Sequence, residues 1–224
     1  MNKSKTVFLF DLNGTVIDDM AYHAKAWHEI LTNDLGADLT WDEVKKEMYG
    51  KNREVLARIF GEDHFSDEEA HRLSVEKEKY YQEAYKPHLK LINGLQDFLA
   101  EAAAHQVKMA IASAAIANNI DFIVDNLDIR RYFDAFVSAD DVETSKPDPE
   151  TFLKAAEKLQ ADPSDCIVLE DAPKGVEAAQ NAGMQCIVIM TAHPKEDFKQ
   201  YDNVIAFIND YEDPFIIDYF SQNA

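Results

Sequence analysis

Cysteine is scarce in this chain, because Cys166 and Cys186 are the only two among 224 residues. Both lie inside strand-like apolar runs, Asp-Cys-Ile-Val-Leu-Glu and Gln-Cys-Ile-Val-Ile-Met. We therefore expect buried, reduced thiols rather than a disulfide or a metal-binding pair. This expectation excludes a cysteine cross-link as the basis of the fold.

Positive charge is also scarce, with 22 lysines and arginines against 42 aspartates and glutamates and a net charge of −20. No basic tract is long enough to offset that charge, so nucleic acid and anionic membranes are disfavoured as partners. An anionic substrate would need a local cation to overcome the negative electrostatic field of the chain. A divalent metal is the expected means.

Long apolar runs are absent as well, and no stretch approaches the length of a membrane span. The apolar run between Lys5 and Asp11 is too short for the hydrophobic region of a signal peptide, so we expect a cytoplasmic protein. The apolar content of 46% and the charged content of 29% are typical of a globular protein with one or two domains.

The pattern of apolar residues divides the chain into a helical block and an alternating region. Helical patterns dominate between residues 20 and 90, with helices expected at 22–35, 42–48, 53–60 and 67–85. Later helices are expected near 95–105, 117–127, 149–159 and 175–182. Between them lie apolar runs at 107–112, 135–138, 167–169, 187–190 and 204–208. This alternation predicts right-handed βαβ crossovers in a parallel sheet.

The first apolar run, residues 7–10, belongs to the same sheet, because a lone strand could not pair its backbone groups. We therefore predict an α/β fold with a Rossmann-like, doubly wound core formed by residues 1–17 and 91–224. The helical block, residues 18–90, is expected to be an inserted cap domain. The acidic, aromatic tail 210–215 is expected to dock a terminal helix.

The first strand delivers Asp11 into a turn at Asn13-Gly14. Open α/β sheets bind ligands at the carboxyl ends of their strands, and Gly14 permits backbone angles that are closed to other residues. A carboxylate at this place suggests a nucleophile or a metal ligand. The spacing alone leaves an ordinary strand-to-helix turn as the alternative.

Two later segments place a hydroxyl and an ammonium near strand ends. Ser113-Ala114 follows an apolar run, and a hydroxyl with backbone amides could hold phosphoryl oxygens there, although a simple helix cap is the alternative. Lys146 lies in Ser-Lys-Pro-Asp-Pro, where the prolines stiffen the loop. It is a candidate phosphate clamp, against the alternative of a solvated lysine.

A third segment places two adjacent carboxylates, Glu170 and Asp171, at the end of a very apolar strand. Adjacent ionised carboxylates repel each other, so the arrangement needs a compensating cation. Hard oxygen ligands at a strand end favour magnesium shared with a substrate phosphate. The alternative is an exposed acidic turn.

These four segments, taken in chain order, resemble the four motifs of the haloacid dehalogenase superfamily, and the resemblance covers nearly the whole chain. Two further segments, 19–27 and 50–53, are similar to cap motifs of its β-phosphoglucomutase subfamily. The resemblance implies a mobile cap and a magnesium-dependent phosphoryl transfer from a small phosphorylated substrate. It also implies that Asp11 is the nucleophile. We expect a monomer.

The resemblance assigns further roles residue by residue. The implied metal ligands are Asp11, Asp171, the backbone carbonyl of Asn13 and Glu170, which supports or binds the ion. The implied phosphoryl-binding groups are Ser113, the amide of Ala114 and Lys146.

In the cap, His23, Arg53 and Lys77 match positions that face the substrate or the acid/base. Their alternatives are packing of His23 on Trp27 and solvated helix charges for the other two.

Two cap residues look unlike those of the mutase. Met20 places a bulky side chain next to the nucleophile loop, and Glu47 precedes the 50–53 loop. If Glu47 reached the metal on closure, the smaller pocket would suit pyrophosphate. The alternative is a solvated helix end beside Lys45 and Lys46. The chain also resembles a subfamily member regarded as an inorganic pyrophosphatase, which is our leading expectation for the activity.

The gravest departure from the family is Asn13, where the motif has an acid/base Asp. An amide can neither give a proton to a leaving group nor take one from water, so we expect this chain to be impaired. The alternatives are a β-phosphoglucomutase or sugar-phosphate phosphatase and, from another class, a catalytically silent phosphometabolite-binding module.

Overall fold

The computed structural model describes residues 6–223, and the chain divides into two compact units. The first unit comprises Met1–Asp18 and Lys90–Ala224, and the second comprises Asp19–Leu89. The second unit is therefore inserted into the first, shortly after its first strand. Within residues 6–223, no helix is both long enough and apolar enough to cross a bilayer.

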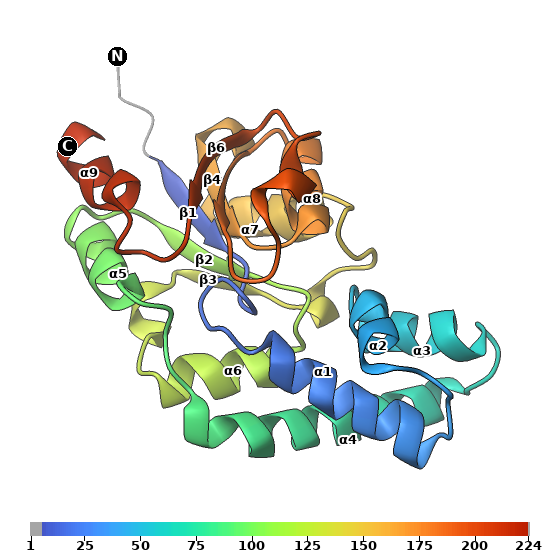
Figure 1. Ribbon diagram of the computed structural model, residues 1–224. Coiled ribbons are helices and arrows are strands. Elements are labelled where there is room, and N and C mark those ends of the chain that lie inside the picture. The colour runs from blue at the N-terminus through green and yellow to red at the C-terminus, as the bar shows by residue number, and fades with distance from the viewer. Residues whose placement is uncertain (1–5, 224) are drawn as a thin grey trace. The chain divides into compact units, whose positions relative to one another are not determined.

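The first unit is built on a six-stranded sheet in which neighbouring strands run parallel (Figure 1). In the order β3-β2-β1-β4-β5-β6, the chain runs outward from β1 in one direction and then from β4 in the other. This is the predicted doubly wound, Rossmann-like topology, with its switch point between β1 and β4. The strands are β1 Val7–Phe10, β2 Met109–Ala112, β3 Ala135–Val137, β4 Cys166–Glu170, β5 Gln185–Ile189 and β6 Val204–Ile208.

One face of the sheet packs against α7 (Glu150–Leu159) and α8 (Pro173–Asn181). Val7 and Leu9 of β1 point to this face and share a core cluster with Phe152 of α7 and Val176 of α8. The free thiols of Cys166 and Cys186 are buried in the same cluster, as predicted. The alternation of β1 residues therefore sends every second side chain to these two helices.

The other face of β1 carries aromatic rings. Phe8 and Phe10 lie with ring centroids 5.1 and 6.0 Å from Phe98 of α5 (Leu95–Ala104). Tyr219 of α9 (Pro214–Asn223) is 5.5 Å from Phe8, so the tail does dock a terminal helix. Both faces of β1 are covered, which explains why its four residues are all apolar and buried. Helix α6 (Ala117–Asn126) also belongs to this unit.

The second unit is helical. Its elements are α1 (Met20–His28), a π-helical segment (Glu29–Asp34), α2 (Trp41–Glu47), α3 (Asn52–Phe60) and α4 (Asp67–Tyr85). Capping boxes at Thr40 and Ser66 start α2 and α4 by satisfying backbone amides of the first turn. A core of its own holds the unit together, formed by Trp27, Ile30, Leu31, Val44, Val55, Leu56, Ala70 and Leu73.

One predicted helix, 22–35, differs in the structure, because its second half is π-helical. The hydroxyl of Thr32 donates to the carbonyl of His28 at 2.6 Å, and the amide of Leu35 donates to the carbonyl of Ile30. His28 is the acceptor that an α-helix would give to the amide of Thr32. Competition from the hydroxyl is a local reason for the wider turn.

We expect Phe8→Ala to lower the free energy of unfolding of the first unit by about 3–5 kcal/mol, because it removes a fully buried ring from the aromatic face. Urea unfolding can be followed unit by unit: thiol labelling of Cys166 and Cys186 reports the first unit, and fluorescence of Trp27 and Trp41 reports the second. Phe215→Ala, at a ring that is 39% exposed, is the matched control and should change little. Equal losses in both variants would contradict the packing argument.

Candidate active site

The sheet register brings two of the candidate carboxylates together. Phe10 pairs with Leu169 across β1 and β4, and the amide of Asp11 donates to the carbonyl of Leu169 at 2.9 Å. The next residue on each strand is therefore Asp11 on one side and Glu170 on the other. They lie at the carboxyl ends of the two strands that flank the switch point.

Lys146 connects these two carboxylates. Its Nζ lies 2.7 Å from Oδ1 of Asp11 and 2.8 Å from Oε1 of Glu170, and all three side chains are buried. The other oxygen of Glu170, Oε2, accepts hydrogen bonds of 2.7 Å from the amides of Asp171 and Ala172. Three donors thus hold Glu170 in place. A buried carboxylate requires such hydrogen bonds to offset the loss of water.

Asp171 lies against the turn that follows Asp11. A Cβ atom added to Gly14 would be 2.1 Å from Oδ2 of Asp171, and Gly14 has a φ of +77°. Only glycine combines that angle with so close an approach. The glycine of the Asn13-Gly14 turn is therefore required both by the backbone and by the carboxylate beside it.

The same turn is held from the C-terminal part of the chain. The hydroxyl of Thr191 donates to the carbonyl of Gly14 at 2.7 Å, and the hydroxyl of Tyr211 donates to the carbonyl of Thr15 at 3.0 Å. Asn13 lies in this turn, in a bridge with Ile17. Sequence reasoning missed Thr191 and Tyr211, because their sequence separation from Asp11 gives no local signal.

Burial and mutual repulsion dominate the electrostatics of the cluster. Burial raises the pKa of Asp11 to about 6, an effect that Lys146 opposes and the charge of Glu170 reinforces. Burial, Glu170 and Asp11 raise the pKa of Asp171 well above its ordinary value. Burial alone would lower the pKa of Lys146, but Asp11 and Glu170 outweigh it and raise that pKa.

The residues present fit a divalent cation. Asp11, Glu170 and Asp171 each offer an oxygen, and these atoms lie within 4.8 Å of one another. One ammonium, that of Lys146, faces three carboxylates, so further positive charge would relieve their repulsion. An oxygen-only donor set suits a hard cation. The alternative of an exposed acidic turn does not hold, because Glu170 and Asp171 are buried.

Ser113 and Ala114 follow β2, the other neighbour of β1. Ser113 is buried, its amide donates to the carbonyl of Val137 at 3.0 Å, and its Oγ accepts from the amide of Ala115 at 3.1 Å. Helix α6 begins only at Ala117, and its N-cap is Ile116. The helix-cap alternative for Ser113 is therefore wrong.

In the second unit, His23 and Lys77 lie in a buried polar cluster. Nζ of Lys77 is 2.7 Å from Nδ1 of His23 and 3.0 Å from Oε1 of Glu78, and His23 stacks on Tyr81 at 3.7 Å between ring centroids. The hydroxyl of Tyr81 donates to Asp19, and Asp19 is 3.4 Å from the imidazole of His23. Lys77 is therefore not a solvated helix charge, and the ring on which His23 stacks is Tyr81 rather than Trp27.

Sequence reasoning missed Asp19, Glu78 and Tyr81 in this cluster. A signal was present, because Asp19 precedes His23 by four residues and Tyr81 follows Lys77 by four, which places each pair on one helical face. The contact between these two helical faces forms only in the tertiary structure, and the sequence gives no local signal for it.

The remaining candidates of the second unit have partners within it. Arg53 forms an exposed ion pair with Asp67. Glu47 lies at the end of α2, where Nε of Arg58 is 3.2 Å from its carboxylate. Met20 is the first residue of α1 and is partly exposed. Glu47 therefore forms an ion pair with Arg58, which the alternative of a solvated helix end beside Lys45 and Lys46 did not foresee.

Comparison with known proteins matches this chain to one family model, two relatives and one solved structure. The family model described as haloacid dehalogenase-like hydrolase matches residues 8–189. An uncharacterized protein of Haemophilus influenzae is 37% identical over 193 residues, covering 82% of this chain and 90% of that protein. The fructose-1-phosphate phosphatase YqaB of Escherichia coli is 30% identical over 184 residues, covering 80% and 93%. The crystal structure of β-phosphoglucomutase from Clostridium difficile superposes with a TM-score of 0.81 at 26% identity, covering 97% and 96%.

We expect Gly175→Ala to destabilise the first unit by roughly 1–3 kcal/mol, because it costs Glu170 a charged hydrogen bond. An added Cβ would lie 1.8 Å from Oε1 of Glu170, the atom that binds Lys146. Helix propensity alone predicts the opposite sign, since alanine is favoured over glycine in a helix such as α8. Urea unfolding monitored by thiol labelling distinguishes the two, and a stabilised variant would show that Glu170 moves aside freely.

Proposed function

The chain belongs to the haloacid dehalogenase-like hydrolase family, and from that premise we propose that it is a metal-dependent phosphohydrolase acting on a small phosphorylated substrate. One observation carries the proposal: Asp11, Lys146, Glu170 and Asp171 converge at the switch point of the sheet. Such a crevice is where doubly wound sheets bind their ligands. A buried carboxylate beside a lysine and further acidic residues is suited to receive a phosphoryl group.

In this proposal Asp11 is the nucleophile. One oxygen of its carboxylate attacks phosphorus, the bond from phosphorus to the leaving oxygen breaks, and the leaving oxygen keeps the electron pair. Lys146 balances charge on Asp11 before attack and on the transferred phosphoryl oxygens during it. Ser113 and the amide of Ala114 hold the same oxygens. Water then attacks phosphorus in the aspartyl-phosphate, the bond from phosphorus to the Asp11 oxygen breaks, and inorganic phosphate and a proton pass to solvent while the carboxylate is restored.

Magnesium is the proposed cofactor, with Asp11, Asp171, Glu170 and the backbone carbonyl of Asn13 as its proposed ligands. When bound, it would neutralise charge on the phosphoryl oxygens and orient them. The buried, oxygen-only donor set and its unbalanced negative charge support this choice. The net charge of −20 makes such a local cation more necessary, because the whole chain repels an anionic substrate.

Sugar phosphates are the substrate class that we propose first. The relative YqaB is named a fructose-1-phosphate phosphatase, and the superposed structure is that of a β-phosphoglucomutase. Both names refer to phosphorylated sugars. The two kinds of reaction differ in the acceptor of the phosphoryl group, which is water for a phosphatase and a sugar hydroxyl for a mutase. We also propose that the helical unit acts as a cap that excludes water, with Met20, His23, Arg53 and Lys77 toward the substrate.

Pyrophosphate is the second candidate, favoured by Glu47. A carboxylate at this position could add a metal ligand and leave room only for a compact substrate. Its ion pair with Arg58 would have to exchange for that contact. The proteins compared above have names that point to sugar phosphates or assign no activity, so pyrophosphate ranks after them.

We expect Asn13→Asp to raise steady-state turnover about 10²- to 10⁴-fold, because it restores a group that can give and take a proton. A panel of hexose phosphates, pentose phosphates and pyrophosphate, assayed with magnesium, ranks the candidates by kcat/KM. A sugar phosphate at the top supports the first candidate, and pyrophosphate at the top supports the second. No turnover of any phosphate by the Asn13→Asp protein would favour a silent binding module instead.

The present chain should accumulate phosphorylated Asp11. Activated phosphates leave readily without a proton, whereas water attacks the phosphoenzyme slowly when no base is present. Rapid-quench mass spectrometry with a reactive phosphoryl donor and magnesium should find one added phosphoryl group, on the peptide that contains Asp11. Asp11→Asn is the control and should take no label. Label on another residue, or rapid turnover with Asn13 in place, would refute the assigned mechanism.

A further inference from the structure

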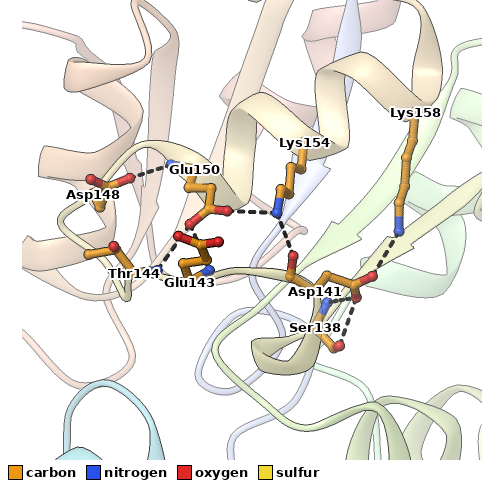
Figure 2. A network of polar contacts seen from close by, with 8 residues as sticks. All are labelled: Ser138, Asp141, Glu143, Thr144, Asp148, Glu150, Lys154 and Lys158. Carbon is orange, nitrogen blue, oxygen red and sulfur yellow. Dashed lines mark hydrogen bonds and ion pairs between the residues drawn. The ribbon is translucent and has the colours of Figure 1, made fainter.

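A network of side chains on α7 holds the loop that carries Lys146. The loop runs from the end of β3 at Val137 to the start of α7 at Glu150. Glu150, Lys154 and Lys158 lie at successive turns of α7, four residues apart, and so share one face of the helix. Figure 2 shows all three pointing toward the loop and contacting it.

Glu150 makes the contacts nearest to Lys146. Its Oε2 accepts hydrogen bonds from the amides of Glu143 at 2.8 Å and Thr144 at 3.0 Å. Its Oε1 lies 2.6 Å from Nζ of Lys154. The hydrogen bonds from Lys154 and the two amides lower the pKa of Glu150 to about 2, so the carboxylate stays ionised and keeps accepting throughout the neutral range.

Lys154 and Lys158 continue the contacts toward the sheet. Lys154 donates to the carbonyl of Asp141 at 2.6 Å, and Lys158 donates to the carbonyl of Phe136 at 2.7 Å. Oδ2 of Asp141 in turn accepts from the amide and hydroxyl of Ser138 (Figure 2). The end of β3 and the first half of the loop are therefore bound to one helix at three levels.

The loop is also fixed just beyond Lys146. The side chain of Asn181 on α8 donates to the carbonyl of Pro147 at 3.0 Å, and the amide of Glu150 donates to Oδ1 of Asp148 at 2.9 Å. Lys146 thus lies between two anchored stretches, the Glu143-Thr144 amides before it and the Pro147-Asp148 turn after it. Of these anchors, Glu150 takes part in both.

We propose that Glu150, supported by Lys154, is a positioning residue that fixes the loop so that the ammonium of Lys146 stays between Asp11 and Glu170. Glu150 does not touch the carboxylate cluster; it acts through the backbone of Glu143 and Thr144. The proposal rests on the proposed function for its consequence, which is that Lys146 is held ready for the transferred phosphoryl group. The structural part of the proposal concerns only how often the ammonium of Lys146 leaves Asp11 and Glu170.

Acylation of Lys146 by an amine-reactive ester, measured by mass spectrometry, tests that structural part without any substrate. A buried, ion-paired lysine reacts only through local opening, so the labelling rate reports how often Lys146 leaves its partners. Glu150→Ala should raise this rate about three- to tenfold, because two backbone hydrogen bonds and an ion pair are lost. Glu150→Gln keeps an acceptor oxygen for the amides and should restore most of the protection. Glu157→Ala, an exposed glutamate on the same helix, is the matched control and should not change the rate.

Labelling of Cys166 and Cys186 in the same samples separates positioning from unfolding, because both thiols are buried in the same unit as Lys146. If the thiols become reactive in parallel with Lys146, Glu150 acts on overall stability and the positioning proposal is wrong. An unchanged Lys146 rate in Glu150→Ala, or an equal rise in Glu157→Ala, would also overturn it.

The catalytic consequence is measured in the Asn13→Asp background. There Glu150→Ala should lower kcat/KM by about two- to tenfold, because a loosened loop places the ammonium of Lys146 less accurately against the phosphoryl group, with partial recovery in Glu150→Gln. Faster labelling with unchanged kcat and KM would overturn the positioning role. If Asn13→Asp turns over no phosphate at all while the labelling behaves as expected, the proposed function fails and the fixation of the loop by Glu150 stands.

Discussion

The rest of the site depends on the ion pairs that the ammonium of Lys146 forms with Asp11 and Glu170. The ammonium lies between Asp11 and Glu170, and its charge is what allows those carboxylates and Asp171 to be buried close together. Without it, each ionised carboxylate would bear the full cost of burial beside like charges. The raised pKa values of Asp11 and Asp171 indicate that one ammonium does not balance the cluster. The same imbalance is what makes the cluster suitable for a divalent cation.

The parallel register of the strands brings these charged residues together. Because β1 lies between β2 and β4, residues that follow three different strands reach the same edge of the sheet. The turn after Asp11 is then fixed by contacts from Thr191 and Tyr211, which come from the far end of the chain. Gly14 satisfies two constraints at once, a left-handed backbone and contact with Asp171. These contacts fix the turn that follows Asp11, and the proposed phosphoryl transfer requires charges that are held in place in this way.

The helical unit contributes a different kind of site. Lys77, His23, Glu78, Tyr81 and Asp19 form a buried polar cluster whose members are joined by hydrogen bonds and ion pairs. Burial lowers the pKa of Lys77, while Glu78 opposes that change. Buried networks of this kind fix side-chain positions at the cost of stability, and they are retained where orientation matters.

The sequence by itself determined the fold class, because the local periodicity of apolar residues predicts strands and helices. It also singled out Asp11, Glu170 and Asp171, because polar residues that follow an apolar strand are a local signal, and Lys146, because prolines stiffen its loop. Other features were decided only by tertiary structure. Glu47 of α2 pairs with Arg58 of α3, Thr191 and Tyr211 donate to the turn after Asp11, and Lys77 of α4 contacts His23 of α1. The partners in each of these contacts belong to separate elements of the chain and meet only through packing, which no local pattern encodes.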